Sequence, residues 1–117
     1  MNLEEIKTLE KQYVMQTYAR NDLFLVKGHG CLLYDDQGSS YIDMTSGIGV
    51  NCLGHNHPAL VEALHDQSQK LMHTSNLYYT EPMVQVAKEL VESTGMSKVF
   101  FANSGAEANE GVIKLAR

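Results

Sequence analysis

The sequence predicts an α/β protein that opens with a helix and a small antiparallel sheet. Apolar residues recur at helical spacing, between charged ones, across residues 3–18. Short apolar runs separated by turn residues follow between residues 24 and 43. Residues 80–117 contain, in this order, a helical pattern, a short apolar run, a polar loop and a second helical pattern. That last order is typical of α/β packing.

The first half of the chain predicts local elements that need few long-range contacts. Residues 3–18 predict an amphipathic helix. In residues 24–43 the runs FLV, CLLY and YIDM are separated by KGHG and DDQGSS, which predicts two or three short antiparallel strands. The SGIGVN stretch that follows contains Gly47 and Gly49, so we expect an irregular backbone there that either adopts positive φ angles or admits a close neighbour.

Two further helices are predicted from their starts. Pro58 suits a first helical turn, with Asn56 or His57 near the cap, and predicts a helix over residues 58–72. Thr80, followed by glutamate and proline, predicts the capped start of a helix that ends at Gly95.

The apolar run KVFFA, residues 98–102, predicts a buried strand because it combines aromatic and β-branched residues. The residues that follow it, NSGAEANEGVIKLAR, predict a further helix.

Composition excludes several classes of function. The formal charge is −5 and no basic stripe is present, which argues against nucleic acid as a partner. No apolar run is long enough to span a membrane, and the charged N-terminus lacks a signal-peptide core, so we expect a cytoplasmic protein. Cys31 and Cys52 do not form a disulfide framework. His55 and His57 lack the further ligands that a metal site requires.

The junction after KVFFA carries the chemistry. The predicted strand ends at Ala102, the loop Asn103-Ser104-Gly105 follows, and a helix starts near Ala106. Such a junction directs free amides and the positive helix end at one point, which suits a phosphate group. Many α/β proteins carry a similar loop that binds nothing, so the residues alone leave both interpretations open. The loop lacks the lysine and glycine spacing of a nucleotide triphosphatase loop.

Three motifs occur in the order found in one enzyme family. FFANSGAEANEGVIKLAR resembles the phosphate-loop segment of class III (subgroup II) pyridoxal-phosphate aminotransferases. LYDDQGSSYIDMTSGIGVNCLGHNHPALVEAL resembles their N-terminal region, and TSNLYYTEPMVQVAKELVESTG their connecting segment. Within the family, SGIGVNCLGHNHP and SGAEANE are most similar to acetylornithine aminotransferases.

The resemblance implies the N-terminal part of a fold type I pyridoxal 5'-phosphate (PLP) enzyme that acts as a homodimer. Residues 1–72 would contribute to the small domain, and residues 73–117 would begin the large cofactor-binding domain. The segment that holds the cofactor phosphate corresponds to Ser104, Gly105 and Ala106. Candidate residues near the substrate are Ser46, Gly47, Ile48, Asn76 and Tyr79. Ornithine-specific relatives carry a tyrosine where this sequence has Ile48, which argues against ornithine as the amino donor.

The same resemblance implies that catalytic groups lie beyond Arg117. The lysine that forms the Schiff base and the aspartate that holds the ring nitrogen belong to later parts of the family's large domain. Lys114 does not match that lysine and fits a helix surface. We therefore expect residues 1–117 alone to be inert, as part of an enzyme that moves an amino group from N2-acetylornithine to the 2-oxo acid 2-oxoglutarate in arginine biosynthesis. The alternatives are an ornithine, succinylornithine or 4-aminobutyrate aminotransferase, or a non-catalytic folded fragment with a weak phosphate site.

Overall fold

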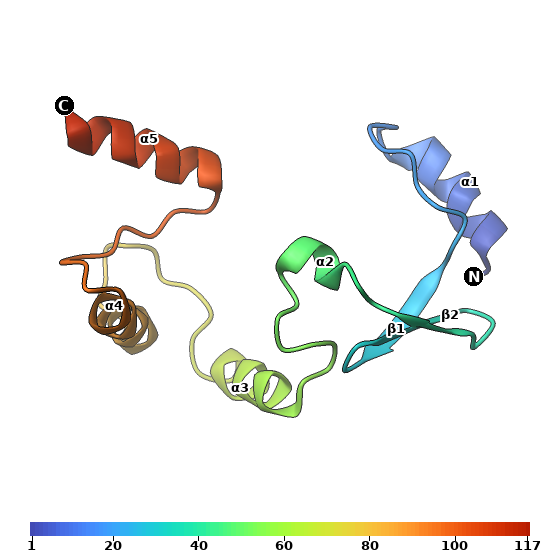
Figure 1. The fold of residues 1–117 in the computed structure, drawn as a ribbon, viewed down its shortest axis with the longest axis horizontal. Coiled ribbons are helices and arrows are strands. Elements are labelled where there is room, and N and C mark those ends of the chain that lie inside the picture. Colours follow the sequence, from blue (N-terminus) through green and yellow to red (C-terminus); the bar gives the residue numbers. More distant parts are fainter. The chain divides into compact units, whose positions relative to one another are not determined.

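A computed structural model describes all residues, 1–117, and contains five helices and one three-stranded sheet (Figure 1). The chain separates into two compact units, Met1–Met72 and His73–Arg117. Each unit is described by itself below. None of the helices combines the length and apolarity that crossing a bilayer requires.

The first unit begins with α1 (Leu3–Tyr13), which has a reciprocal capping box. The Asn2 side chain accepts the Glu5 N–H, and the Glu5 carboxylate accepts the Asn2 N–H, both at 3.0 Å. The prediction of a helix to residue 18 is wrong at its C-terminal end. The backbone turns extended at Val14, and the Gln16 side chain donates to the carbonyl groups of Glu10 and Val14 instead. The Val14 carbonyl, which a longer helix would use, is thereby satisfied by a side chain, whereas the Glu10 carbonyl also keeps its helical bond from the Val14 N–H.

An antiparallel sheet follows, in the order β1 (Leu25–His29), β2 (Leu32–Asp35) and β3 (Ser40–Ile42). The predicted short antiparallel strands are therefore confirmed. Gly30, in the β1–β2 turn, has a φ of 55°, a conformation that favours glycine.

The β2–β3 turn is closed by one buried carboxylate. The Asp35 side chain accepts the backbone N–H groups of Gln37 and Ser39 at 3.0 and 2.8 Å. The turn and its register therefore depend on an aspartate at this position.

Beyond the sheet lie a four-residue turn, α2 (Ser46–Gly49), and the helix α3 (Pro58–Ser68). His57 is the N-cap and Pro58 opens the helix, as predicted, but the helix ends before residue 72. At its end the Gln67 carbonyl accepts the N–H groups of both Lys70 and Leu71 at 3.1 Å. The i→i−3 bond from Lys70 tightens this last turn, as is common at helix ends.

The second unit contains α4 (Glu81–Thr94) and α5 (Gly105–Ala116). Thr80 is the N-cap of α4, and Gly95 ends it with a φ of 73° and an N–H bond to the Val91 carbonyl at 3.0 Å. Both helices and the glycine terminator are confirmed.

The buried strand predicted for residues 98–102 does not form. The segment has no strand structure, and Phe100 remains 73% exposed. A strand needs a neighbouring strand to pair its backbone groups, and the second unit contains none. Phe100 instead lies against α5, where a Cβ added to Gly111 would come within 3.0 Å of the ring.

Apolar side chains are left without partners in both units. No hydrophobic residue is buried, and the two helices of the second unit do not pack against each other. The residues expected on the apolar side of α4, among them Met83, Val86 and Leu90, are exposed. The amphipathic pattern has formed the helix, while the other helix of the second unit does not cover its apolar side.

Candidate functional site

The N-terminus of α5 is the candidate phosphate site. Ser104 is its N-cap, with an extended backbone (φ −152°, ψ 161°) and an Oγ that accepts the Glu107 N–H at 3.3 Å. The Ser104 carbonyl accepts the Ala108 N–H at 3.0 Å. The amides of Gly105 and Ala106 stand in the first turn, where a helix offers them no acceptor. The structure thus brings Ser104, Gly105 and Ala106 together with two free amides.

Access and charge at this helix end fit an anion. A Cβ added to Gly105 would meet no atom within 4 Å, so a ligand can approach the backbone closely. The Ser104 hydroxyl, while accepting from Glu107, retains its own O–H to donate. The Glu107 carboxylate is engaged by the Asn103 N–H at 2.6 Å. The residues present therefore fit a phosphate group, held by two amides, one hydroxyl and the positive end of a 12-residue helix.

The predicted substrate-side residues form a left-handed turn in the first unit. Ser46, Gly47, Ile48 and Gly49 have φ angles of 49°, 62°, 63° and 80°. Positive φ at the two glycines is confirmed, whereas the same conformation at Ser46 and Ile48 was not predicted. A β-branched residue rarely adopts it, so glycine content alone could not signal it. The Ile48 side chain is 94% exposed.

Asp43, a residue that sequence reasoning missed, anchors this turn. Its Oδ1 accepts the N–H and hydroxyl of Thr45 and the N–H of Ser46, and its Oδ2 lies 2.7 Å from His55 Nε2. The hydrogen bond from His55, together with those from Ser46 and Thr45, lowers the pKa of Asp43 to about 2. An Asx-type spacing, Asp43-x-Thr45, was the only available sequence signal.

The histidines and cysteines of the first unit do not gather into a metal site. His55 is engaged by Asp43, and His57 is at the N-cap position of α3, where its side chain makes no capping hydrogen bond. Cys31 and Cys52 are free and exposed. No group of three potential metal ligands occurs in the structure.

Asn76 and Tyr79, in the second unit, lie in the segment before α4. Asn76 follows Ser75, which has a φ of 64°, and the Tyr79 side chain is 99% exposed. No hydrogen bond joins either residue to the start of α5. Their predicted role near the substrate stays a prediction.

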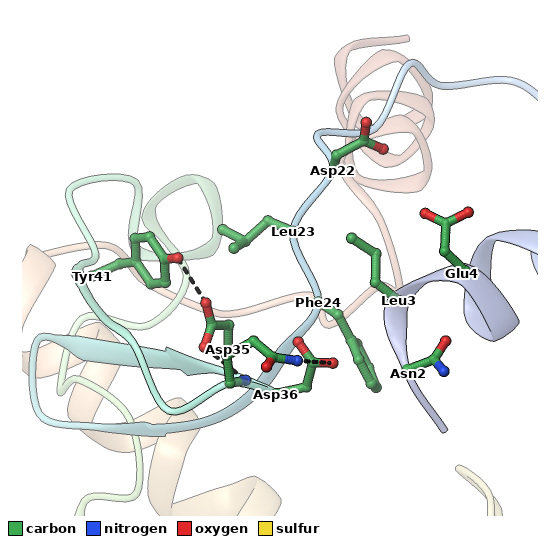
Figure 2. Close-up of a pocket in the computed structure, with 10 residues that line it drawn as sticks. Asn2, Leu3, Glu4, Asp22, Leu23, Phe24, Asp35, Asp36 and Tyr41 are labelled. Atoms are coloured by element: carbon green, nitrogen blue, oxygen red, sulfur yellow. Dashed lines mark hydrogen bonds between the residues drawn. The ribbon is translucent and has the colours of Figure 1, made fainter.

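A separate cavity of about 420 Å³ lies in the first unit, and Figure 2 shows that acidic side chains surround it. Its lining includes Glu4, Asp22, Asp35 and Asp36, and none of the predicted site residues. The Tyr41 hydroxyl donates to Asp35 at 2.7 Å (Figure 2), which lowers the pKa of Asp35 and raises that of Tyr41. A cavity with this charge does not suit a phosphate group.

Comparison with known proteins agrees with the motifs. A sequence model of the aminotransferase class-III family matches residues 13–117. The acetylornithine aminotransferase of Haemophilus ducreyi is 56% identical over all 117 residues, which are 30% of its own length.

Solved structures show the same fold. The acetylornithine aminotransferase of Elizabethkingia anophelis matches 99% of this chain and 30% of its own with a TM-score of 0.93 and 34% identity. The taurine:2-oxoglutarate aminotransferase of Bifidobacterium kashiwanohense, solved in complex with PLP and glutamate, matches all of this chain and 28% of its own, with a TM-score of 0.87 and 33% identity. The chain thus spans about 30% of the length of these relatives. Its helices and three-stranded sheet are the N-terminal part of their α/β fold, and the chain belongs to the class III aminotransferase family.

Proposed function

We propose that this chain is the N-terminal portion of a PLP-dependent aminotransferase that moves an amino group from N2-acetylornithine to 2-oxoglutarate. The observation that carries the proposal is the start of α5, where Ser104 caps the helix and the amides of Gly105 and Ala106 are free. The donor is supported by the relative from Haemophilus ducreyi, which is named for acetylornithine.

In this proposal the start of α5 binds the phosphate of the cofactor. The amides of Gly105 and Ala106 and the hydroxyl of Ser104 donate to phosphate oxygens, and the helix dipole stabilises their negative charge. When bound, the cofactor supplies an electron sink for the carbon that loses a proton. The contribution of these residues is to fix one end of the cofactor, so that its reactive end is held in a constant position.

The left-handed turn at Ser46, Gly47 and Ile48 is proposed to border the substrate. Ile48 presents an exposed apolar side chain there, without the hydroxyl that a tyrosine would offer to a free amine. In N2-acetylornithine the α-amine is acylated and only the transferred side-chain amine is free, so an apolar residue here fits acetylornithine better than ornithine. Asn76 and Tyr79 are proposed as further residues that line the active site.

The remaining catalytic groups are proposed to come from parts of the protein outside residues 1–117. They include the lysine that bonds the cofactor and the aspartate at its ring nitrogen. The same proposal assigns residues 1–72 to a small domain and residues 73–117 to the start of a large one. It also includes a homodimer and a cytoplasmic location. Residues 1–117 alone are then inert.

The test uses the full-length protein that contains this chain. Amino transfer to 2-oxoglutarate is measured from acetylornithine, succinylornithine, ornithine and 4-aminobutyrate, and kcat/KM is compared. Acetylornithine is expected to be the best donor. If acetylornithine is the poorest of the four donors, the substrate assignment is wrong. If no amine donates an amino group, the proposed aminotransferase activity is wrong.

A further inference from the structure

The side chains of Asp43 and His55 form a contact between two segments of the first unit. Because a carboxylate only accepts hydrogen bonds, His55 Nε2 carries the proton and donates it to Asp43 Oδ2 at 2.7 Å. The Asp43 side chain is only 5% exposed. The pair therefore lies in a partly dehydrated position, where the bond is stronger than at an exposed surface.

His55 is itself held by the sheet region. Its N–H and carbonyl exchange hydrogen bonds with Gly30 at 2.8 and 2.9 Å, in an antiparallel bridge. Its ring lies over Gly28, where an added Cβ would come within 2.6 Å of the His55 Cγ. The position of the imidazole is thus fixed by the backbone bridge to Gly30 and by the contact of the ring with Gly28.

The other carboxylate oxygen of Asp43, Oδ1, accepts hydrogen bonds from the beginning of the left-handed turn. Oδ1 accepts the Ser46 N–H at 2.8 Å, the Thr45 N–H at 3.0 Å and the Thr45 hydroxyl at 2.9 Å. From the other side, the Ser46 hydroxyl donates to the Asn51 carbonyl at 2.8 Å. Both ends of the turn are therefore tied by side-chain hydrogen bonds.

The turn needs such support because its backbone is unfavourable for these residues. Ser46 and Ile48 have positive φ angles, and β-branched side chains such as isoleucine rarely adopt them. Strained residues of this kind persist only where surrounding interactions hold them.

We propose that the Asp43–His55 pair is a positioning device that keeps the turn at Ser46–Gly49 left-handed and so fixes where the Ile48 side chain is presented. Its consequence for substrate binding rests on the proposed function, in which this turn borders the substrate. Neither Asp43 nor His55 contacts substrate in this proposal; both act through the turn.

The first experiment measures backbone amide exchange over residues 44–51 in the full-length protein. Asp43→Ala is expected to accelerate exchange there about tenfold or more, because the turn loses its anchor. Asp43→Asn retains an oxygen for Ser46 and Thr45 and is expected to give a smaller increase; it also serves if the alanine variant does not fold. Asp36→Asn is the matched control, since the Asp36 side chain accepts a hydrogen bond only from the neighbouring Gln37 side chain and the substitution leaves the backbone unchanged. If amide exchange over residues 44–51 is as slow in both Asp43 variants as in the Asp36→Asn control, the proposal is wrong.

The second experiment tests whether the pair acts by holding a strained turn. Ile48→Gly removes the unfavourable side chain, so Asp43→Ala should accelerate exchange less in this background than in wild type. An equal acceleration in both backgrounds would contradict the strain argument. In steady-state kinetics, Asp43→Ala is expected to raise KM for the amino donor more than it lowers kcat. A fall in kcat with KM unchanged would contradict a positioning role at the substrate.

The two proposals fail in different ways. If wild-type protein transfers no amino group, the proposed function fails, while the exchange results still decide the role of Asp43. If exchange is unaffected, the positioning role fails, while wild-type transfer from acetylornithine still supports the function.

Discussion

The Tyr41 hydroxyl donates a hydrogen bond of 2.7 Å to the Asp35 carboxylate, and so joins β3 to the end of β2. The same carboxylate accepts two backbone N–H groups of the turn between the strands. One side chain therefore sets both the turn and the position of the strand that leaves it.

Removal of this hydroxyl is expected to weaken the hairpin. Tyr41→Phe in the full-length protein should lower the melting temperature by about 2–4 °C, because a charge-assisted bond is lost while the ring remains. Tyr13→Phe is the control, since the Tyr13 ring is exposed and its hydroxyl makes no hydrogen bond. Equal melting temperatures for the two variants would show that the bond does not contribute.

The charge of Asp43 predicts a pH dependence of stability. Its pKa is lowered from 3.8 to about 2 in the folded protein, so its contribution to stability is complete above about pH 5 and is lost as the pH falls toward 2. The difference in free energy of unfolding between wild type and Asp43→Asn should therefore shrink between pH 5 and about pH 2. Urea denaturation at a series of pH values measures it. A difference that grows on acidification would contradict the assignment.

The phosphate site can be tested at one backbone amide. Gly105 is the first residue of α5, a position that proline tolerates, and Ser104 before it already has the extended backbone that a following proline requires. Proline at position 105 therefore removes the N–H without disturbing the helix start. Gly105→Pro is expected to weaken PLP binding to the full-length protein about tenfold, the effect of one charge-assisted bond. Gly105→Ala keeps the amide and meets no protein atom, so it is the matched control that measures separately what an added side chain does to binding. If equilibrium binding gives the Gly105→Pro and Gly105→Ala proteins the same affinity for PLP, the Gly105 amide does not bind the phosphate.

Donor preference is expected to follow residue 48. Ile48→Tyr adds a hydroxyl and bulk at an exposed position of the turn, and should shift kcat/KM toward ornithine relative to acetylornithine by about tenfold. Ile48→Val, which keeps an apolar β-branched side chain, should leave the ratio unchanged. A ratio that is the same in all three proteins would place the specificity elsewhere.

Residues 1–117 in isolation are expected to associate or to be only partly ordered. No hydrophobic side chain is buried, and apolar residues of the helices are exposed in both units. Light scattering should detect species larger than a monomer, or thermal unfolding should be broad. A sharp two-state melt of a monomer would contradict this expectation.

The elements that were predicted correctly depend on neighbouring residues. Thr80 and Pro58 mark helix starts, and Gly95 ends a helix through a positive φ that glycine tolerates. The short strands follow from turn residues that lie between them. Ser104 could be placed at a helix start for the same reason, and the structure has it as the N-cap of α5; that this helix start binds a phosphate group stays a prediction from the family motif.

The errors lie where distant groups decide. Residues 98–102 have the composition of a buried strand, yet form none because no neighbouring strand is present to pair with them.

The sequence alone was enough to predict the family, the helix starts and a candidate phosphate loop, because capping and motif spacing are local properties of the chain. Only the tertiary structure showed that Ser46 and Ile48 are left-handed and that Asp43 and His55 hold them there. Twelve residues separate that pair along the chain. Local propensity opposes positive φ at a β-branched residue, and only contacts made by the folded chain can outweigh it.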